Sequence, residues 1–307
     1  MRRISWAFSS LLALCAAWLV QLSPYARQAR AVEQGSAVFI APGWFTMGAT
    51  QGDVEFARRL CVTERMSEAL RLRGCANEDL FSEESPARRV YVSGFWLDRF
   101  ELSRSEYAAC VAVGACSVPV RPTEHPGLTH PRHPMVGISQ VQAAEACRFR
   151  GGRLPSEAEW ERGARGDSGR RFPWGNFHNE GLANQGGASP SGAGAEGQPS
   201  DRDGFAFAAP VDAFFQARSP HGLVQMAGNV WEWTRDTYVP LAVVNQRVNP
   251  SETRTPGLWV VRGGSFRSPA YALRVTHREP RPAGTGFVDV GVRCAYDAPD
   301  RSAPSGP

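Results

Sequence analysis

Glycine and proline are spread along this chain, and their distribution limits its fold more than any other sequence feature. The 307 residues include 31 glycines and 23 prolines. Both residues interrupt helices and favour turns, so a chain that carries them throughout cannot form long regular elements. Hydrophobic residues still make up 42% of the sequence, which is enough for a packed core. We therefore expect a folded, loop-rich protein with short helices and strands.

The first 31 residues have the layout of a secretory signal peptide. Arg2 and Arg3 precede an apolar run from Trp6 to Leu22, and Ala29-Arg30-Ala31 has the small-x-small form of a cleavage site. The mature chain would then begin near Val32 and be exported, to the periplasm, the cell envelope or the medium.

Two other interpretations of this segment stay open. The apolar run approaches the length of a membrane-spanning helix, so the segment can also be an uncleaved anchor. Cys15 is the candidate attachment point of a lipoprotein, although the bulky Leu14 precedes it where a small residue is usual. Apart from such an anchor, we expect no contact with a membrane.

The charges exclude several partners and enzyme classes. The formal charge of the whole chain is +4, and residues 1–31 hold four arginines and no acid, so their removal leaves 30 basic against 30 acidic residues. A neutral chain is not expected to bind nucleic acid through bulk charge. All 34 basic residues are arginine, which excludes mechanisms that need a lysine, such as a Schiff base or a P-loop.

Six cysteines follow the signal segment, and an even number in an exported chain favours three disulfides. The candidate bridges are Cys61–Cys75 and Cys110–Cys116, which close short loops, and Cys147–Cys294, which closes a long one. The sequence does not fix the connectivity of the first four, and free buried thiols are an alternative. Zinc binding is less expected, because the chain has no C-x-x-C pair.

Local patterns predict short strands and helices. Residues 36–50 have the alternation and the central Pro-Gly of a β-hairpin, and residues 88–100 repeat the strand signal. Capping boxes at Ser103, Ser139 and Ser156 predict helices over residues 104–112, 140–149 and 157–165. The polar segment 51–84 is expected to be an insertion held by its own disulfide, and residues 299–307 a flexible tail.

A series of short blocks, in order, resembles the formylglycine-generating-enzyme family, also called the sulfatase-modifying-factor family. The blocks are GWFTMG (43–48), ESP (84–86), FWLD (95–98), ELS (101–103), HPMVGIS (133–139), GRLPSEAEWE (152–161), FPWG (172–175), GNVWEWT (228–234), RGGSF (262–266) and GVRC (291–294). Together they cover nearly the whole mature chain. The resemblance implies one α+β domain over residues 32–298, with a C-type-lectin-like, loop-rich fold.

The same blocks also have a structural interpretation. Trp160, Trp174, Trp231 and Trp233 each carry a large apolar area and an N–H that needs a partner, so they are expected in the core. Their charged residues are candidates for buried ion pairs that hold irregular loops in one arrangement. These charged residues are Arg153, Glu157, Glu161, Glu232 and Arg262.

The resemblance further implies two structural calcium sites. In the first, Asn184 and Asp203 would supply side-chain oxygens, and Gln185 and Phe205 backbone carbonyls, which suits a hard cation. Hydrogen-bonded turns without a metal are the alternative interpretation.

In the second calcium site, Glu232 would supply a carboxylate, and Gly228 and Val230 backbone carbonyls. Gln225 stands where the family usually has Asn or Asp. This difference weakens the second site, because a longer neutral amide must reach the same ion. Hydrogen-bonded turns are again the alternative.

The copper site of the family's oxidase is missing from this sequence. That oxidase binds copper through two cysteines just after the RGGSF block, because soft Cu(I) needs thiolates. Here Ser268 and a position near Ala272 stand in their place, and no cysteine occurs between Cys147 and Cys294. The resemblance therefore implies that copper is not bound and that formylglycine is not made. It also implies a structural disulfide between Cys147 and Cys294.

Other catalytic centres have little support. Family members that resemble ergothioneine-pathway sulfoxide synthases hold iron with three histidines, mostly from an added helical domain that is absent here. Only His125, His130 and His133 cluster, and their spacing is not that of two ligands on one helix face. Whether iron is bound stays open. Ser265 is not part of a G-x-S-x-G elbow, so the sequence gives no sign of a serine nucleophile.

Three functions fit these observations. The first, which we prefer, is a monomer that binds a peptide or small molecule in a cleft near Trp231, Ser265, Ser268 and Arg274. The second is a metal- and oxygen-dependent oxidoreductase of the wider family that acts on an exported peptide or a secondary metabolite. The third is a structural envelope protein. A shared fold does not decide among them, so whether the chain is an enzyme stays open.

Overall fold

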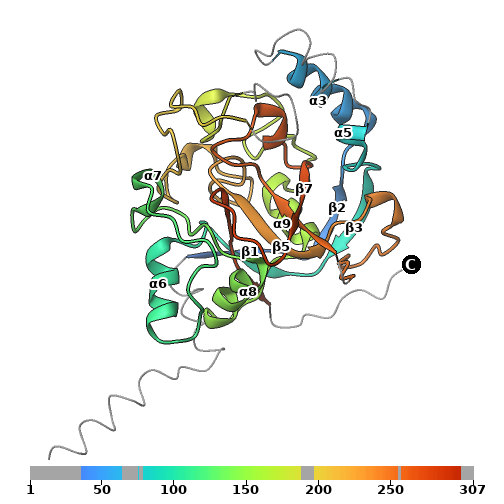
Figure 1. Cartoon of the computed structure of the whole chain (residues 1–307). Helices are drawn as coiled ribbons and strands as arrows, with labels where there is room; N and C mark the ends of the chain where they lie inside the picture. Colours follow the sequence, from blue (N-terminus) through green and yellow to red (C-terminus); the bar gives the residue numbers. More distant parts are fainter. Residues whose placement is uncertain (1–35, 64–74, 76–78, 188–196, 255–256, 299–307) are drawn as a thin grey trace, which may run out of the picture.

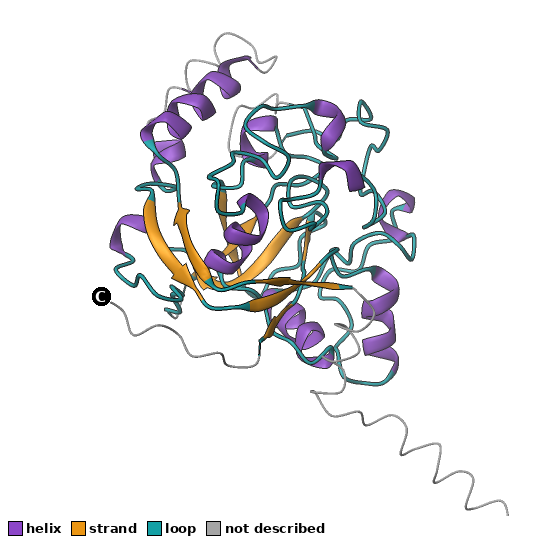
Figure 2. Cartoon of the chain, turned by 180° about the vertical axis from the view of Figure 1, so that it is seen from behind, coloured by secondary structure: helices purple, strands orange, loops and turns teal. Residues whose placement is uncertain are grey.

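The computed structural model describes residues 36–63, 75, 79–187, 197–254 and 257–298. Loops connect short elements throughout this part of the chain (Figures 1 and 2). The α-helices are α3 (Gln51–Thr63), α5 (Asp79–Ser82), α6 (Arg104–Ala112), α7 (Pro126–Thr129), α8 (Gln140–Phe149) and α9 (Glu157–Arg165). Short 3₁₀ helices are η2 (Glu180–Leu182), η3 (Phe215–Ala217), η4 (Leu241–Val243) and η5 (Ala270–Leu273). The predicted loop-rich α+β class is confirmed.

Strands β1 (Ala37–Ile40) and β2 (Gly43–Met47) do not pair with each other. β1 pairs with β4 (Phe95–Asp98), and β2 pairs with β3 (Arg88–Val92), in one continuous antiparallel register interrupted at residues 41–42 and 93–94. The predicted hairpin within residues 36–50 is therefore wrong. Pro42 has no N–H for a ladder bond, so it interrupts the long ribbon instead of closing a tight turn.

A second sheet lies at the centre of the molecule (Figure 2). Its order is β7 (Arg278–Pro282), β6 (Leu258–Arg262), β5 (Trp231–Thr237) and β8 (Val290–Gly291). The β5–β8 pair is parallel, and the other two pairs are antiparallel. Strand β9 (Ala295–Asp297) adds to β4 in the first sheet. Trp231 and Trp233 of β5 and Trp160 of α9 are fully buried in the core, as expected, whereas Trp174 is only partly buried.

The three predicted capping-box helices are confirmed with their predicted bounds. Ser103, Ser139 and Ser156 are the N-caps of α6, α8 and α9, and each hydroxyl accepts the N–H of the third helical residue. In each box the side chain at that third position accepts the serine N–H in return. Residues of α9 are buried along the whole helix, so its charged side chains need partners inside the protein.

The three expected disulfides are present: Cys61–Cys75, Cys110–Cys116 and Cys147–Cys294. The long-range bridge joins α8 to the residue before β9. The short Cys61–Cys75 bridge lies in segment 51–84, which contains α3 and α5.

Helix α3 packs against η5, which follows the RGGSF block in the sequence. Phe56 and Leu60 of α3 contact the apolar cluster that contains Leu273 of η5. Asp53 at the start of α3 accepts from Arg171 at 2.8 Å, and the Arg171 guanidinium lies 4.5 Å from the Phe56 ring centroid. Helix α3 is therefore docked on η5. In the ranges that the structure describes, no helix combines the length and apolar character of a membrane span.

Candidate functional site

The expected buried ion pairs are present and hold the central loops. Glu232 on β5 accepts from Trp160 Nε1 at 2.6 Å, and from Arg293 Nε and Nη2, each at 2.7 Å. Glu161 accepts from Arg262 Nη2 at 2.6 Å. Because all these groups are buried, each charge has a partner of the opposite sign within the core.

A second buried cluster is centred on Glu84, to which no role was assigned from the sequence. Its two oxygens accept from Arg274 Nη1 at 2.7 Å and Nη2 at 2.6 Å. Thr276 Oγ1 lies at 2.7 Å and His277 Nδ1 at 2.8 Å from the same carboxylate. Burial opposes ionisation, but Arg274 and then His277 prevail and lower the pKa of Glu84. Only the fold brings these residues together, so the sequence held no local signal for them.

The first set of candidate calcium ligands lies on two segments of the chain, residues 184–185 and 203–205. The two Asp203 oxygens accept the N–H groups of Gln185, at 2.7 Å, and Phe205, at 2.9 Å, and the first of these bonds joins the two segments. Asn184 Oδ1 is buried and has no hydrogen-bond partner among the described residues. Burial raises the pKa of Asp203 despite these bonds. The two segments therefore offer oxygen atoms of the kind that calcium binds.

The second candidate set fits a cation less well. Arg293 already supplies positive charge to Glu232, and its Nη2 also donates to the carbonyls of Val224, at 2.9 Å, and Gln225, at 3.4 Å. Gln225 Nε2 donates to the Pro210 carbonyl at 2.8 Å, while its Oε1 has no partner among the described residues. Gly228 follows in the same turn, with φ of 81°. Val230 is buried beside it.

Glu101 lies beside this second set, and sequence reasoning gave it no role. Asn229 Nδ2 donates to Glu101 Oε2 at 2.7 Å, whereas Glu101 Oε1 is buried without a partner in the described part of the chain. Burial, followed by the nearby charge of Glu232, raises the pKa of Glu101 well above its usual range. Glu101 lies in the ELS block at 101–103, which marked it as a residue of interest. The block does not show whether this glutamate is a buried structural residue or a metal ligand.

The four side chains expected to line a cleft are all buried. Trp231, Ser265 and Ser268 are 0% exposed, and Arg274 is 1% exposed. Ser268 Oγ accepts the Ser265 N–H at 2.9 Å, and Ser265 Oγ donates to Asp289 at 3.1 Å. In the described structure these four side chains lie in the interior rather than along an open cleft, so the expected cleft is not seen there.

Gly264 shows how closely the segment after RGGSF folds on itself. Its φ is 79°, and a Cβ built there would lie 2.6 Å from Leu273 Cδ2, 3.1 Å from the Ala272 carbonyl and 3.4 Å from Ser268 Cβ. Ser268 and η5 therefore converge on one point. Trp231 Nε1 is also buried, and it has no partner among the described residues.

The clustered histidines are used in local turns. His125 Nδ1 accepts the Gly127 N–H at 3.1 Å, and His130 Nδ1 accepts the Arg132 N–H at 3.2 Å. The His130 and His133 rings are 5.2 Å apart. Among the described residues, no three His, Cys, Asp or Glu side chains are grouped as metal ligands.

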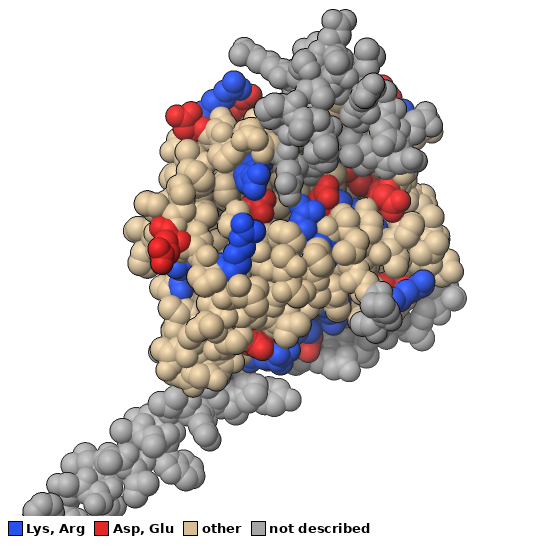
Figure 3. Space-filling model, viewed as in Figure 1, with Lys and Arg blue, Asp and Glu red and all other residues tan. Residues whose placement is uncertain are grey.

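Figure 3 shows acidic and basic side chains interspersed on one face of the molecule.

Comparisons with known proteins agree with this architecture. Residues 23–298 match the protein family described as "Sulfatase-modifying factor enzyme 1-like domain". The mouse (Mus musculus) formylglycine-generating enzyme is 31% identical over 70% of this chain and 69% of that protein. The enzyme of the same name from Thermomonospora curvata is 31% identical over 73% of this chain and 89% of that protein.

Solved structures share the fold at lower sequence identity. PvdO from Pseudomonas aeruginosa superimposes with a TM-score of 0.63 at 21% identity, over 85% of this chain and 94% of that one. Treponema denticola variable protein 1 gives a TM-score of 0.60 at 17% identity, over 85% of this chain and 94% of that one. With the family match over residues 23–298, these findings identify the chain as a member of the sulfatase-modifying-factor family, whose enzymes include the formylglycine-generating enzymes.

Proposed function

We propose that this chain is an exported sulfatase-modifying-factor-like protein that binds a peptide or small molecule and does not oxidise cysteine to formylglycine. The observation that carries the proposal is that its cysteines are paired in disulfides. All six cysteines of the described residues are paired in disulfides, and the seventh, Cys15, lies in the signal-like segment. No thiol of the mature chain is then free to bind Cu(I).

The positions near the expected copper site support the same proposal. Ser268 is buried, and its hydroxyl is engaged by the Ser265 N–H. Ala272 has no side-chain donor at all. A hydroxyl and a methyl group are poor ligands for soft Cu(I), so this place lacks the chemistry of the oxidase. A mouse relative, 36% identical over 54% of this chain and 49% of that protein, is named "Inactive C-alpha-formylglycine-generating enzyme 2", and its name describes a similar protein as inactive.

Two observations support export and ligand binding. Three disulfides in one chain are stable only where the environment is oxidising, as it is outside the cytoplasm. The buried Trp231 N–H has no partner among the described residues, although an indole N–H in a core normally has one. A ligand or solvent molecule beside Trp231 would supply the missing acceptor. Because α3 covers the neighbouring η5, α3 is the element expected to adjust to that ligand.

Calcium is the proposed structural cofactor of this protein. Asn184 and Asp203 would hold it with side-chain oxygens, and Gln185 and Phe205 with backbone carbonyls. The ion would supply positive charge to the half-buried Asp203 carboxylate and hold the two segments that carry these residues together. The set of Gln225, Gly228, Val230 and Glu232 is a weaker proposal, because Arg293 already neutralises Glu232.

A paired assay of binding and turnover tests the proposed function. The mature protein, loaded with copper, is mixed with a fluorescent sulfatase-type cysteine peptide, oxygen and a thiol reductant. We expect no aldehyde product, while the formylglycine-generating enzyme of Thermomonospora curvata converts the same peptide. Saturable anisotropy without turnover would identify a peptide-binding member. Catalytic turnover of the peptide by this protein would overturn the proposal.

A further inference from the structure

An exposed apolar surface lies on β2, β3 and the chain beside β3. Trp44 on β2 is 38% exposed, and its ring meets the Tyr91 ring of β3 edge to face, with 5.6 Å between the centroids. Trp44 and Tyr91 are paired in the β2–β3 register, so their side chains lie on the same face of the ribbon. Val248, which is 39% exposed, pairs with Tyr91 from the other side of β3. Large apolar side chains are therefore gathered at the surface of this ribbon.

Two exposed arginines border this apolar surface. The Arg89 guanidinium lies 5.9 Å from the centroid of the Trp44 ring, which is within the range of a cation–π contact. Arg247 Nη1 donates to the Arg89 carbonyl at 3.3 Å, so the two arginines are neighbours. Within the described ranges, neither arginine forms an ion pair with a carboxylate. We call Trp44, Arg89, Arg247 and Val248 the Trp44 patch.

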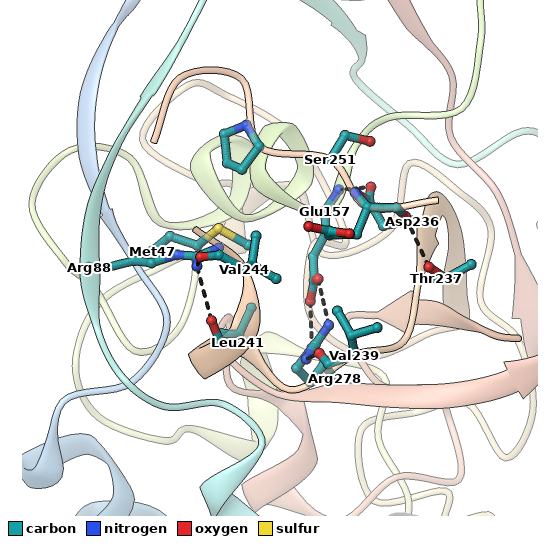
Figure 4. Close-up of a pocket in the computed structure, with 12 residues that line it drawn as sticks. Met47, Arg88, Glu157, Asp236, Thr237, Val239, Leu241, Val244, Ser251 and Arg278 are labelled. Carbon is teal, nitrogen blue, oxygen red and sulfur yellow. Dashed lines mark hydrogen bonds and ion pairs between the residues drawn. The ribbon is translucent and has the colours of Figure 1, made fainter. Parts of the chain in front are cut away.

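Arg88, the preceding residue of β3, shows that this strand separates an inner arginine from an outer one. The Arg88 guanidinium points into the protein, where its Nη1 donates to two backbone carbonyls (Figure 4). Successive side chains of a strand point to opposite faces, so Arg89 points outward, and it is exposed. The Trp44 patch is therefore on the outer side of β3, away from the buried acids Glu157 and Asp236 that lie near Arg88.

Phe39 and Pro42 add exposed apolar surface on the preceding part of the ribbon. Both are exposed, and they meet over Gly94, where an added Cβ would lie 3.2 Å from an atom of each. Residues 23–36 alone separate β1, which carries Phe39, from the apolar run Trp6–Leu22. Such a stretch spans at most about 50 Å. If that run is an uncleaved membrane anchor, which the sequence leaves open, β1 is kept within this distance of the bilayer.

We propose that the Trp44 patch docks the protein on an anionic phospholipid surface, where Trp44 and Val248 contact the headgroup region and Arg89 and Arg247 bind lipid phosphates. Tryptophan favours the boundary between membrane and water, because its ring has an apolar body and a polar N–H. A basic residue close to an anionic leaflet adds attraction over a short range. The mature chain is neutral overall, so this attraction is local to the patch. The exposed apolar side chains favour a lipid surface over an acidic peptide, which would need only the two arginines.

Co-sedimentation with phospholipid vesicles tests the proposal on residues 32–307, which contain every described element. The apolar N-terminal run is omitted, because it would bind vesicles by itself. We expect binding to equimolar vesicles of phosphatidylglycerol and phosphatidylcholine, no binding to phosphatidylcholine alone, and weaker binding as sodium chloride is added.

Arg89→Gln and Arg247→Gln should each weaken binding to the mixed vesicles about fivefold. Arg121→Gln is the matched control, because Arg121 is also exposed and has no ion pair among the described residues. It lies on the loop beside Gly137, outside the patch, and its variant should bind as the wild type does.

Trp44→Gln separates a lipid surface from an acidic peptide as the partner. The substitution removes the apolar contact and keeps both arginines, so vesicle binding should fall at least as much as in Arg89→Gln. If Trp44→Gln binds the mixed vesicles as the wild type does, or if heptaglutamate displaces the protein from them at constant ionic strength, the partner is an acidic chain and the proposal is wrong. Absence of binding to the mixed vesicles, or an equal loss in Arg121→Gln, also contradicts it. If a melting curve shows that a variant on β2 or β3 does not fold, Arg247→Gln decides.

Discussion

Glu84 and Arg274 form a bidentate ion pair in the protein interior, although 190 positions separate them in the sequence. Both side chains are 1% exposed. Glu84 ends segment 51–84, and Arg274 directly follows η5, so the pair ties this segment to the part of the chain where the family's oxidase carries its copper ligands. The docking of α3 on η5 thus has an electrostatic anchor as well as an apolar one.

Replacing Glu84 with glutamine should lower the free energy of unfolding by about 3 to 5 kcal/mol, because Arg274 is then buried without a counter-charge. Urea unfolding followed by circular dichroism measures this change. Glu55→Gln is the control, since the Glu55–Arg59 pair is exposed and should contribute less than about 0.5 kcal/mol. Equal losses in the two variants would show that the Glu84 pair adds nothing beyond a surface contact.

Stability should fall as the pH rises above about 6.5, because the unfolded chain then releases the proton that His277 still holds in the folded protein. Burial acts against protonation, but hydrogen bonds to Glu279 and Glu84 outweigh it and raise the pKa of His277. Because the pKa of His277 is higher in the folded protein than in the unfolded chain, protonated His277 contributes its full share to the free energy of unfolding below the unfolded pKa. This share is lost as the pH rises through the folded pKa.

His277→Gln should remove this part of the pH dependence, which urea midpoints between pH 6 and pH 9 would measure. His125→Asn serves as the control, because asparagine can still cap α7 and His125 lies on an exposed loop. A pH profile that stays unchanged in His277→Gln would assign the dependence to another group.

Calcium at about a hundred times its dissociation constant should stabilise the wild type by about 2.7 kcal/mol. Asp203→Ala should abolish most of this gain, while Asp201→Ala should retain it, because Asp201 is exposed and is not among the proposed ligands. Asp203 also accepts two backbone N–H groups, so its loss destabilises the turn even without metal. The decisive quantity is therefore the difference in melting temperature with and without calcium for each variant. If chelation leaves the wild-type melting temperature unchanged, hydrogen bonds alone hold the turn.

Removing the Cys147–Cys294 bridge by a double alanine substitution should cost about 5 kcal/mol by the chain-entropy model, because the bridge spans 147 positions. The same change at Cys110 and Cys116, which lie 6 positions apart, should cost only about 2 kcal/mol. All four cysteines are buried, so the comparison separates loop length from the loss of apolar contact. Similar losses in the two variants would contradict the chain-entropy account.

The candidate site was only partly predictable. The Asn184 and Asp203 positions came from the family resemblance, and in the structure a hydrogen bond from the Gln185 N–H to Asp203 joins the two segments on which they lie. Glu84 and Glu101 lie in the ESP and ELS blocks, but the sequence predicted no contact or function for either. An acidic residue in a sequence gives no indication of a partner that is distant in the chain. The four residues expected to line a cleft are all buried, and their burial could not be predicted because it depends on segments distant in the sequence.

The sequence alone determined the features that depend on contacts within a few residues. Ser103, Ser139 and Ser156 set the starts of three helices, because a capping box is complete within four positions. The tertiary structure decided what needs partners distant in the chain, such as the pairing of β1 with β4 and the Glu84–Arg274 ion pair. These outcomes depend on which surfaces are buried together, and burial is a property of the whole fold rather than of any local pattern.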